Sequence, residues 1–170
     1  VKYDSNATLT TPVFTNPYTA EGEAILAAKK ADSGDIGTRT FEFVLTKPDG
    51  TKDTVTAGAG EEKNFGKLTY TLKDAGQSFT YYIHETDDDQ AGVEYDTHTE
   101  TIVVTVEDLG NGQLGVKYDG KESFTTPEFK NTYTANGEAI LSAQKANSGD
   151  IGTTRTFEFI LTKPDGTTDT

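Results

Sequence analysis

The sequence contains a second copy of its own beginning. Residues 1–54 recur as residues 116–170, with one inserted threonine and roughly three positions in four identical, as expected for a repeated structural unit. The period of about 115 residues suits one small domain per repeat. We therefore predict a complete repeat at 21–135, the last strands of a preceding repeat at 1–20, and the first part of a following repeat at 136–170.

Composition excludes several classes of protein. The chain carries a net charge of −13, which argues against nucleic acid and anionic membrane as partners because their phosphates would be repelled. It has no cysteine, so an exported domain of this kind needs a stabilising device other than a disulfide. We find no apolar run long enough to span a bilayer and no signal peptide, and expect a segment of a longer exported protein.

Apolar and polar residues alternate between turn-forming segments, which predicts short antiparallel strands and no amphipathic helix. We expect strands at residues 24–31, 40–46, 67–72, 78–85, 99–107, 113–118 and 128–133. About seven strands in this length are typical of a β-sandwich. The Lys-Pro-Asp-Gly sequence at 47–50 predicts one hairpin turn, and residues 108–112 predict another. The short junction at 133–138 predicts a stiff array of domains.

The first predicted strand carries a lysine on its buried face. Lys30 shares that face with Leu26 and Ala28, because side chains two residues apart point to the same side of a sheet. The second copy keeps this lysine as Lys145, whereas Lys29, which faces the other way, is replaced by glutamine. A lysine that recurs on an apolar face requires an explanation.

Two further polar residues lie on predicted inward faces. Glu85 ends the alternation of strand 78–85, and Asn131 lies between two aromatic residues of strand 128–133, as Asn16 does in the earlier copy. Burying an isolated charge costs more than the net stability of a domain, roughly 5 to 15 kcal/mol. These groups must therefore form a hydrogen-bonded buried cluster, reach solvent at the strand ends, or react with one another.

Six short segments follow one another along the chain: Lys30; Phe41-Glu42-Phe43; Tyr82-Ile83-His84-Glu85; Gly92-Val93-Glu94-Tyr95-Asp96; Val104-Thr105-Val106-Glu107-Asp108 with Gly112; and Phe129-Lys130-Asn131-Thr132-Tyr133. This ordered set resembles the streptococcal pilin isopeptide linkage domain, the T-antigen backbone-pilin family related to the collagen-adhesin B-type domains. The resemblance covers the complete repeat and both partial ones.

The resemblance implies an all-β, Ig-like sandwich of the collagen-adhesin B type, with tandem repeats joined end to end. It implies an intramolecular isopeptide bond between Lys30 and Asn131, assisted by Glu85. In the partial copies, Asn16 and Lys145 are expected to bond to partners in the preceding and following repeats.

The residues agree with this chemistry. Burial favours the neutral forms of amines and acids, so a neutral Lys30 could attack the carboxamide of Asn131. A protonated Glu85 would hydrogen-bond to that carboxamide, polarise its carbonyl and shuttle protons as ammonia leaves. The reaction occurs once and consumes its own side chains, so we expect no turnover enzyme, no cofactor and no metal.

These observations lead us to expect a structural repeat of a Gram-positive cell-surface fibre, either an adhesin stalk or a pilus-like shaft anchored to the cell wall. The bond would resist force and proteolysis. The expected partners are neighbouring repeats of the same chain and other fibre subunits, with no membrane insertion in this segment. The sequence does not indicate a host ligand.

Other functions stay open from the sequence. A module that binds sugar or protein would use exposed tyrosines and the loops 32–38 and 86–90. A calcium-stabilised domain would use the aspartates of those loops, since hard cations prefer several oxygen ligands, although the spacing matches no known calcium loop. The aspartates are Asp32, Asp35, Asp87, Asp88 and Asp89.

A conventional enzyme fits the sequence least well. His84 is next to Glu85 but faces the opposite side of its strand, and His98 lies in a polar run, so neither belongs to a recognisable triad. The glycine-containing segment 32–37 lacks the lysine and the strand-to-helix context of a phosphate-binding loop.

Overall fold

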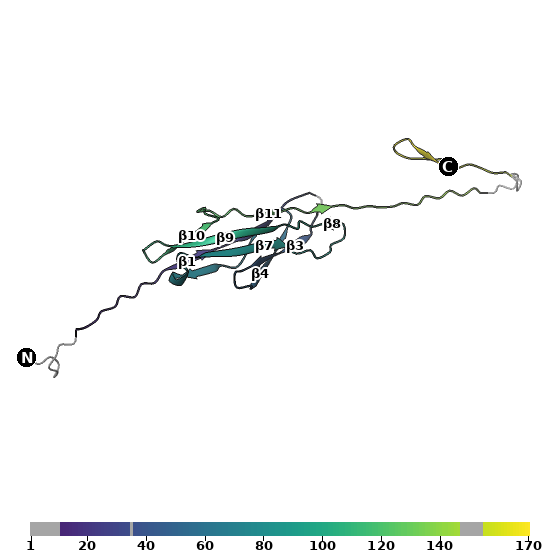
Figure 1. Ribbon diagram of the computed structural model, residues 1–170. Coiled ribbons are helices and arrows are strands. Elements are labelled where there is room, and N and C mark those ends of the chain that lie inside the picture. Colours follow the sequence, from purple (N-terminus) through teal and green to yellow (C-terminus); the bar gives the residue numbers. More distant parts are fainter. Residues whose placement is uncertain (1–10, 35, 147–154) are drawn as a thin grey trace, which may run out of the picture. The chain divides into compact units, whose positions relative to one another are not determined.

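The computed structural model describes residues 11–34, 36–146 and 155–170. The chain divides into two compact units, Val1–Thr134 and Ala135–Thr170. The first unit is an all-β, Ig-like sandwich (Figure 1), as the alternation of residues predicted. The described residues contain no α-helix, and their one helical element is the 3-10 turn η1 (Leu72–Asp74). None of their helices is long and apolar enough to cross a membrane.

One layer of the sandwich is an antiparallel sheet of five strands in the order β10-β9-β7-β3-β4. Its strands are β3 (Thr40–Thr46), β4 (Lys52–Gly58), β7 (Ser78–Glu85), β9 (Thr99–Asp108) and β10 (Leu114–Tyr118). The predicted bounds of β3 and β7 are confirmed, because both strands alternate between buried and more exposed side chains over most of their length.

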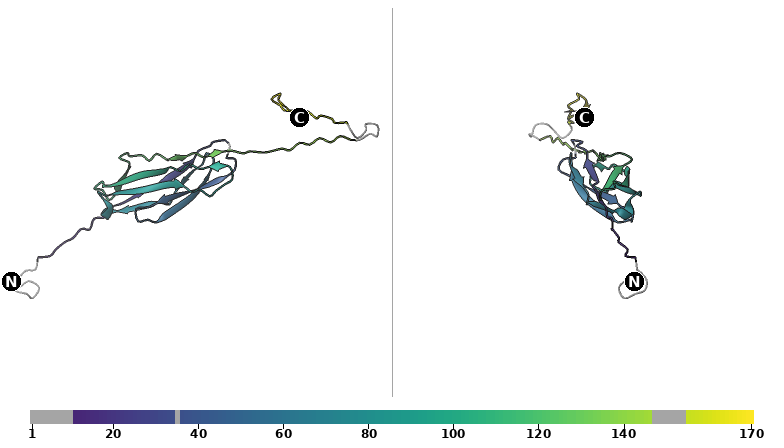
Figure 2. Two further views of the ribbon diagram at one scale, coloured as in Figure 1. Left: turned by 45° about the vertical axis from the view of Figure 1, so that its right-hand side comes forward. Right: turned by 90° about the vertical axis from the view of Figure 1, so that its left-hand side faces the viewer.

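The facing layer consists of shorter strands (Figure 2). They are β1 (Glu21–Ala24), β2 (Ala27–Lys30), β5 (Glu62–Asn64), β6 (Leu68–Thr71) and β11 (Glu128–Phe129). Here β1 pairs with β6, while β2 lies between β5 and β11. The pairing of β2 with β11 is parallel, with Phe129 opposite Lys30. A strand from the beginning of the domain and a strand from near its end therefore run side by side in the same direction.

Two predicted strands are interrupted in the structure. The strand expected at 24–31 breaks after Ala24, because β1 pairs with β6 and β2 with β5. The strand expected at 128–133 breaks into β11 and β12 (Thr132–Tyr133), which pairs with β8 (Val93–Glu94). β4, β5 and β8 were not predicted. β5 and β8 are too short and too polar to produce a clear alternation.

Both predicted hairpin turns are confirmed. In the first, the Lys47 N–H donates to Thr51 O at 2.9 Å, and Gly50 takes a φ of 81°. In the second, between β9 and β10, the Leu109 N–H donates to Gln113 O at 3.1 Å.

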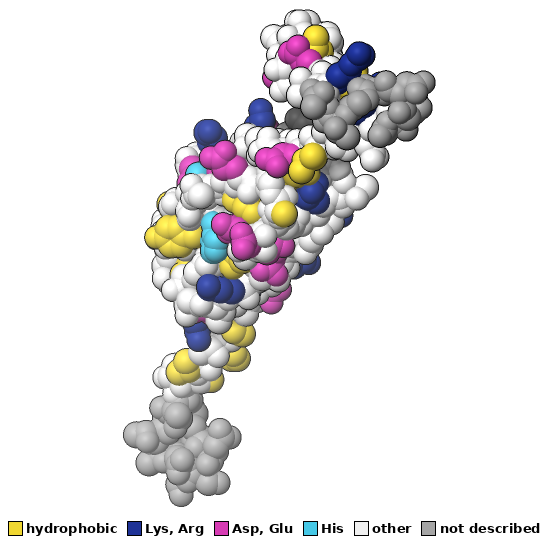
Figure 3. Space-filling view, turned by 90° about the vertical axis from the view of Figure 1, so that its right-hand side faces the viewer, with side chains coloured by type: hydrophobic (Ala, Val, Ile, Leu, Met, Phe, Trp, Pro, Cys, Tyr) yellow, Lys and Arg dark blue, Asp and Glu magenta, His cyan; other side chains and the backbone are white. Residues whose placement is uncertain are grey.

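The core between the layers is built from aromatic and branched aliphatic side chains. Its largest members include Leu26, Ile36, Phe41, Phe43, Leu45, Ile83, Ile102, Val104, Val106 and Phe129. Three buried residues of the described chain are charged or carry an amide: Lys30, Glu85 and Asn131. Outside this core, acidic and basic side chains are scattered over the surface (Figure 3).

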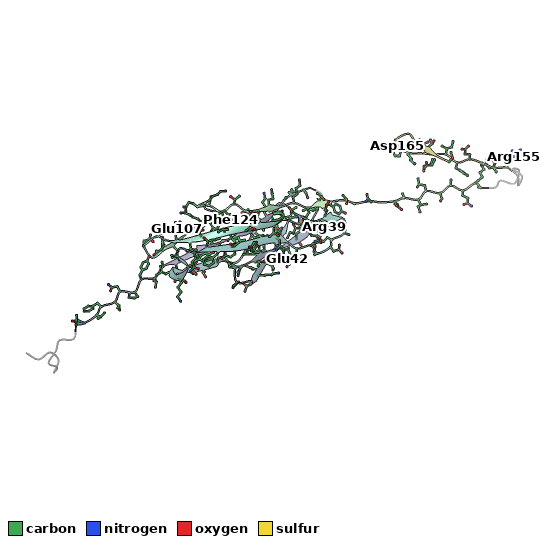
Figure 4. The ribbon with its side chains drawn as sticks, in the orientation of Figure 1. Arg39, Glu42, Glu107, Phe124, Arg155 and Asp165 are labelled. Carbon is green, nitrogen blue, oxygen red and sulfur yellow. The ribbon has the colours of Figure 1, made fainter. Side chains whose placement is uncertain are left out.

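Several apolar residues of the partial copies are exposed where their counterparts in the complete copy are buried. Phe14 is 88% exposed, whereas Phe129 is fully buried. Leu141 is 70% exposed, whereas Leu26 is fully buried. In the second unit, the described residues form one hairpin, β13 (Leu161–Thr162) with β14 (Thr168–Asp169), around a turn that contains Asp165 (Figure 4).

Candidate functional site

Lys30, Glu85 and Asn131 meet in the core of the sandwich. The Lys30 Nζ lies 3.0 and 2.8 Å from the two carboxylate oxygens of Glu85. The Nδ2 of Asn131 donates to Oε1 of the same carboxylate at 2.6 Å. The side chains of Lys30 and Glu85 have no solvent-exposed surface, and Asn131 is also fully buried. The structure thus brings together the three side chains that the strand faces predicted.

Strand ends bring these groups together. Lys30 is the last residue of β2 and Glu85 is the last residue of β7. Asn131 follows β11, which is held against β2 by the Ala31 N–H donating to Phe129 O at 2.9 Å. The cluster therefore contains residues from both layers of the sandwich and from the early and late parts of the domain's sequence.

Aromatic rings surround the amine. The Lys30 Nζ lies 4.5 Å from the centroid of the Phe41 ring, which packs edge to face against Tyr95 at 5.8 Å. Phe43 lies opposite Glu85 and Phe129 lies opposite Lys30 in the strand register, and their ring centroids are 5.1 Å apart. Such walls exclude water and strengthen every electrostatic interaction inside them.

This burial lowers the pKa of Lys30. Desolvation of the ammonium is the main cause, and the hydrogen bond and charge of Glu85 offset only part of it. The neutral, nucleophilic form of the amine is therefore more accessible here than on the surface.

The orientation of the Asn131 carboxamide differs from the sequence-based expectation. We expected Glu85 to polarise the carbonyl, but Oδ1 instead accepts a hydrogen bond from the backbone N–H of Asp96 at 2.9 Å. An N–H group can only donate, so it must face the carbonyl oxygen, and the NH₂ group then faces Glu85. The carboxyl group of Glu85 therefore contacts the nitrogen that would leave as ammonia, and the carbonyl oxygen has a different hydrogen-bond donor, the Asp96 N–H.

The Asp96 carboxylate also binds two backbone segments near the cluster, at Lys130 and at His98. Its Oδ2 accepts the Lys130 N–H at 2.9 Å, and its Oδ1 accepts the His98 N–H at 3.1 Å and lies 2.6 Å from His98 Nδ1. The His98 ring stacks on Phe129, with centroids 4.3 Å apart. Neither Asp96 nor His98 was predicted to belong to the site. The available signal was the Asp-Thr-His order, since an aspartate commonly binds the N–H two residues later.

Comparison with known families decides the relationship. The FctA family model, described as a Spy0128-like isopeptide containing domain, matches residues 25–134. The chain belongs to the FctA family. The match spans all three residues of the cluster and agrees with the resemblance to the streptococcal pilin isopeptide domain. A comparison with curated proteins gave no match.

In this FctA domain, Asp96 should contribute stability that depends on pH. Burial alone would raise the pKa of Asp96, but hydrogen bonds from Lys130 and His98 outweigh it and keep the pKa below its usual value. A carboxylate of this kind stabilises the fold fully above the unfolded pKa, near about 4, and loses that effect as the pH falls through the folded value.

We predict that Asp96→Asn, made in a Glu85→Gln background where no cross-link is expected, lowers the free energy of unfolding at pH 7 by about 1 to 3 kcal/mol. The two unfolding curves should converge as the pH falls below the folded pKa of Asp96, where the carboxylate is protonated in both states. Thermal unfolding followed by circular dichroism measures both values. A gap that persists in acid would contradict this role of the carboxylate.

Two aspartates of the acidic loop 86–90 accept hydrogen bonds from nearby groups of the FctA domain. Asp88 accepts hydrogen bonds from the Tyr95 hydroxyl and, at 3.0 Å, from Gln90 Nε2, while Asp87 accepts the Asp89 N–H at 2.9 Å. In the part of the chain that the structure describes, no group of three acidic or histidine side chains could hold a metal ion. Asp35, one of the proposed calcium ligands, lies outside that part. Calcium stabilisation therefore gains no support.

The structure also describes Asn16 and Lys145, the counterparts of Asn131 and Lys30 in the partial copies. Asn16 and Lys145 are both exposed, and the Lys145 Nζ lies 4.9 Å from the centroid of the Phe157 ring. Their bonds to further repeats stay a prediction.

Proposed function

We propose that this FctA domain is a structural repeat of a Gram-positive cell-surface fibre, a pilus-like shaft or an adhesin stalk, and that it locks itself with an isopeptide bond between Lys30 and Asn131. One observation carries the proposal: the amine of Lys30 and the amide nitrogen of Asn131 share a single oxygen of Glu85 in a dry core, at 3.0 and 2.6 Å. Membership of a pilin-type family supports the structural role and an extracellular location.

The first step is a proton transfer. The Lys30 ammonium gives one proton to Glu85, which leaves a neutral amine and a protonated acid in contact. A low-polarity cavity favours this neutral pair over two buried charges. The amine then attacks Cγ of Asn131, and the carbonyl oxygen becomes negative. The Asp96 N–H, already 2.9 Å from that oxygen, stabilises the charge.

The second step releases ammonia. Glu85 donates its proton to Nδ2 of Asn131, the group that it already contacts at 2.6 Å. The same carboxylate then takes a proton from the attached Lys30 nitrogen, and the carbonyl re-forms as ammonia leaves. Atoms and charges balance: one amine and one carboxamide give one secondary amide and one ammonia. Folding supplies the effective concentration that an unactivated amide requires.

This reaction consumes its own side chains, so the domain is not a turnover enzyme and needs no cofactor. Its partners are neighbouring copies of the repeat and other fibre subunits. The exposed apolar residues of the partial copies support a tandem array, because several of them, among them Phe14, Leu141 and Phe159, have a buried counterpart in the complete copy.

Intact mass spectrometry tests the proposal. The folded chain should weigh one ammonia less than its sequence, and digestion should yield one branched peptide that joins Lys30 to Asn131. Lys30→Gln should abolish the loss. The matched control is Lys29→Gln, a change that the second copy itself contains; this side chain is 42% exposed and pairs with Glu128. An unreacted mass for the folded wild-type chain would refute the bond.

A further inference from the structure

Tyr18 and Tyr133 are the same residue in successive copies of the repeat. Tyr18 lies just before β1, where the chain enters the sandwich, and Tyr133 lies in β12, where the chain leaves at the opposite end (Figure 1). The two positions therefore show the two sides of one junction. Tyr18 shows how the domain contacts the tyrosine of the preceding copy, and Tyr133 shows how the domain contacts its own tyrosine.

At the entry, the tyrosine hydroxyl is bound by the β9–β10 hairpin. The Tyr18 hydroxyl donates to Asp108 Oδ1 at 2.8 Å and accepts the Gly112 N–H at 3.1 Å. Asp108 is held in place by the Gly110 N–H at 2.9 Å. The partners lie 90 and 94 residues away in the sequence, so this is a tertiary contact rather than a local turn.

At the exit, the tyrosine ring is held by its own domain. The guanidinium of Arg39 lies over the Tyr133 ring, 4.4 Å from its centroid. Gly92 allows the ring to lie against the backbone, since a Cβ at this glycine would come within 2.8 Å of the ring. The Thr134 N–H also donates to Gly92 O at 2.8 Å. Figure 4 labels Arg39 at this end of the sandwich and Glu107, the neighbour of Asp108, toward the other.

We propose that each junction tyrosine is a clamp between consecutive repeats. The residue equivalent to Arg39 in its own repeat holds the ring, and the hairpin at 108–112 of the following repeat binds the hydroxyl. The hairpin is thus an interaction surface whose partner is the last strand of a preceding copy of this domain. The clamp restricts rotation between neighbouring domains. It rests on the tandem array of the proposed function.

Paired spin labels test the clamp in this chain. The chain has no cysteine, so a double variant with Thr15→Cys in the entering segment and Thr56→Cys on β4 carries spin labels at these two positions and nowhere else. Both positions are exposed. Pulsed electron resonance should give one narrow distance distribution. Tyr18→Phe should broaden it, because loss of a hydrogen bond of this strength raises a released population about fivefold. Asp108→Ala should act in the same way from the hairpin side.

Tyr82→Phe is the matched control. Tyr82 is 44% exposed and Tyr18 is 45% exposed, but the Tyr82 hydroxyl makes no hydrogen bond to any residue that the structure describes. An unchanged distribution in Tyr18→Phe, or equal broadening in Tyr82→Phe, overturns the clamp. The mass of each sample reports the isopeptide bond separately, so a failure of the cross-link and a failure of the clamp give different results.

Discussion

Glu85→Gln should leave the chain one ammonia heavier than the reacted wild-type chain. Glutamine keeps the size of the side chain but cannot take a proton from the Lys30 amine or return one to Asn131 Nδ2. Because both transfers use this one carboxyl group, we expect bond formation to stop rather than to slow. Intact mass after prolonged incubation of the folded variant measures the outcome directly.

Folding of this variant needs its own check. Replacing Glu85 leaves Lys30 without its buried partner, which costs about 3 to 5 kcal/mol unless the amine stays neutral. Dispersed amide signals in an NMR spectrum identify a folded sample. Glu107→Gln is a suitable control, since that carboxylate is 46% exposed and pairs with Lys117. A folded Glu85→Gln chain that has lost ammonia would rule out the acid as proton shuttle.

Asn131→Ala should lengthen by about 330 to 360 Å more than the wild-type chain when both are pulled by their ends, because about 100 residues between Lys30 and Asn131 become extensible. In the linked chain, tension crosses from β2 to the residue after β11 through side chains and never enters that segment. In the variant, only non-covalent contacts resist the pull, among them the short parallel pairing of β2 with β11. Single-molecule force spectroscopy measures the gain in length.

The control for this experiment is Asn16→Ala, the same change in the partial copy. It should extend like the wild-type chain, since Lys30 and Asn131 remain linked. The equilibrium counterpart of the effect is a loss of about 4 to 5 kcal/mol of stability on the loop-entropy model. Equal extension of the wild-type and Asn131→Ala chains would mean that no covalent link carries the load.

Regular alternation made much of the sandwich predictable. β3 and β7 have the predicted bounds because their side chains alternate between an apolar core and a polar surface. The same parity pointed to Lys30, Glu85 and Asn131 as inward-facing groups. Which face of a strand a side chain occupies, its strand parity, depends only on its position along that strand, so the sequence alone is enough to predict it.

Long-range pairing was not predictable in this way. β1 and β2 separate because they have different partners, β6 and β5, and nothing within residues 21–30 records that change. The role of Asp96 depends on a loop that reaches both Lys130 and Asn131, 34 and 35 residues away. The orientation of the carboxamide follows from that loop, and strand parity alone therefore could not show that the carbonyl faces away from Glu85.

The parallel arrangement of β2 and β11 also bears on how such a fibre would age. Lys30 ends the first of these strands and Asn131 follows the second, so a link between them makes the intervening main chain a closed side loop. A hydrolytic nick in the exposed stretch from Asp87 to Asp89 would open that loop without parting the filament. Covalent continuity along the fibre would then tolerate damage over most of the length of each domain.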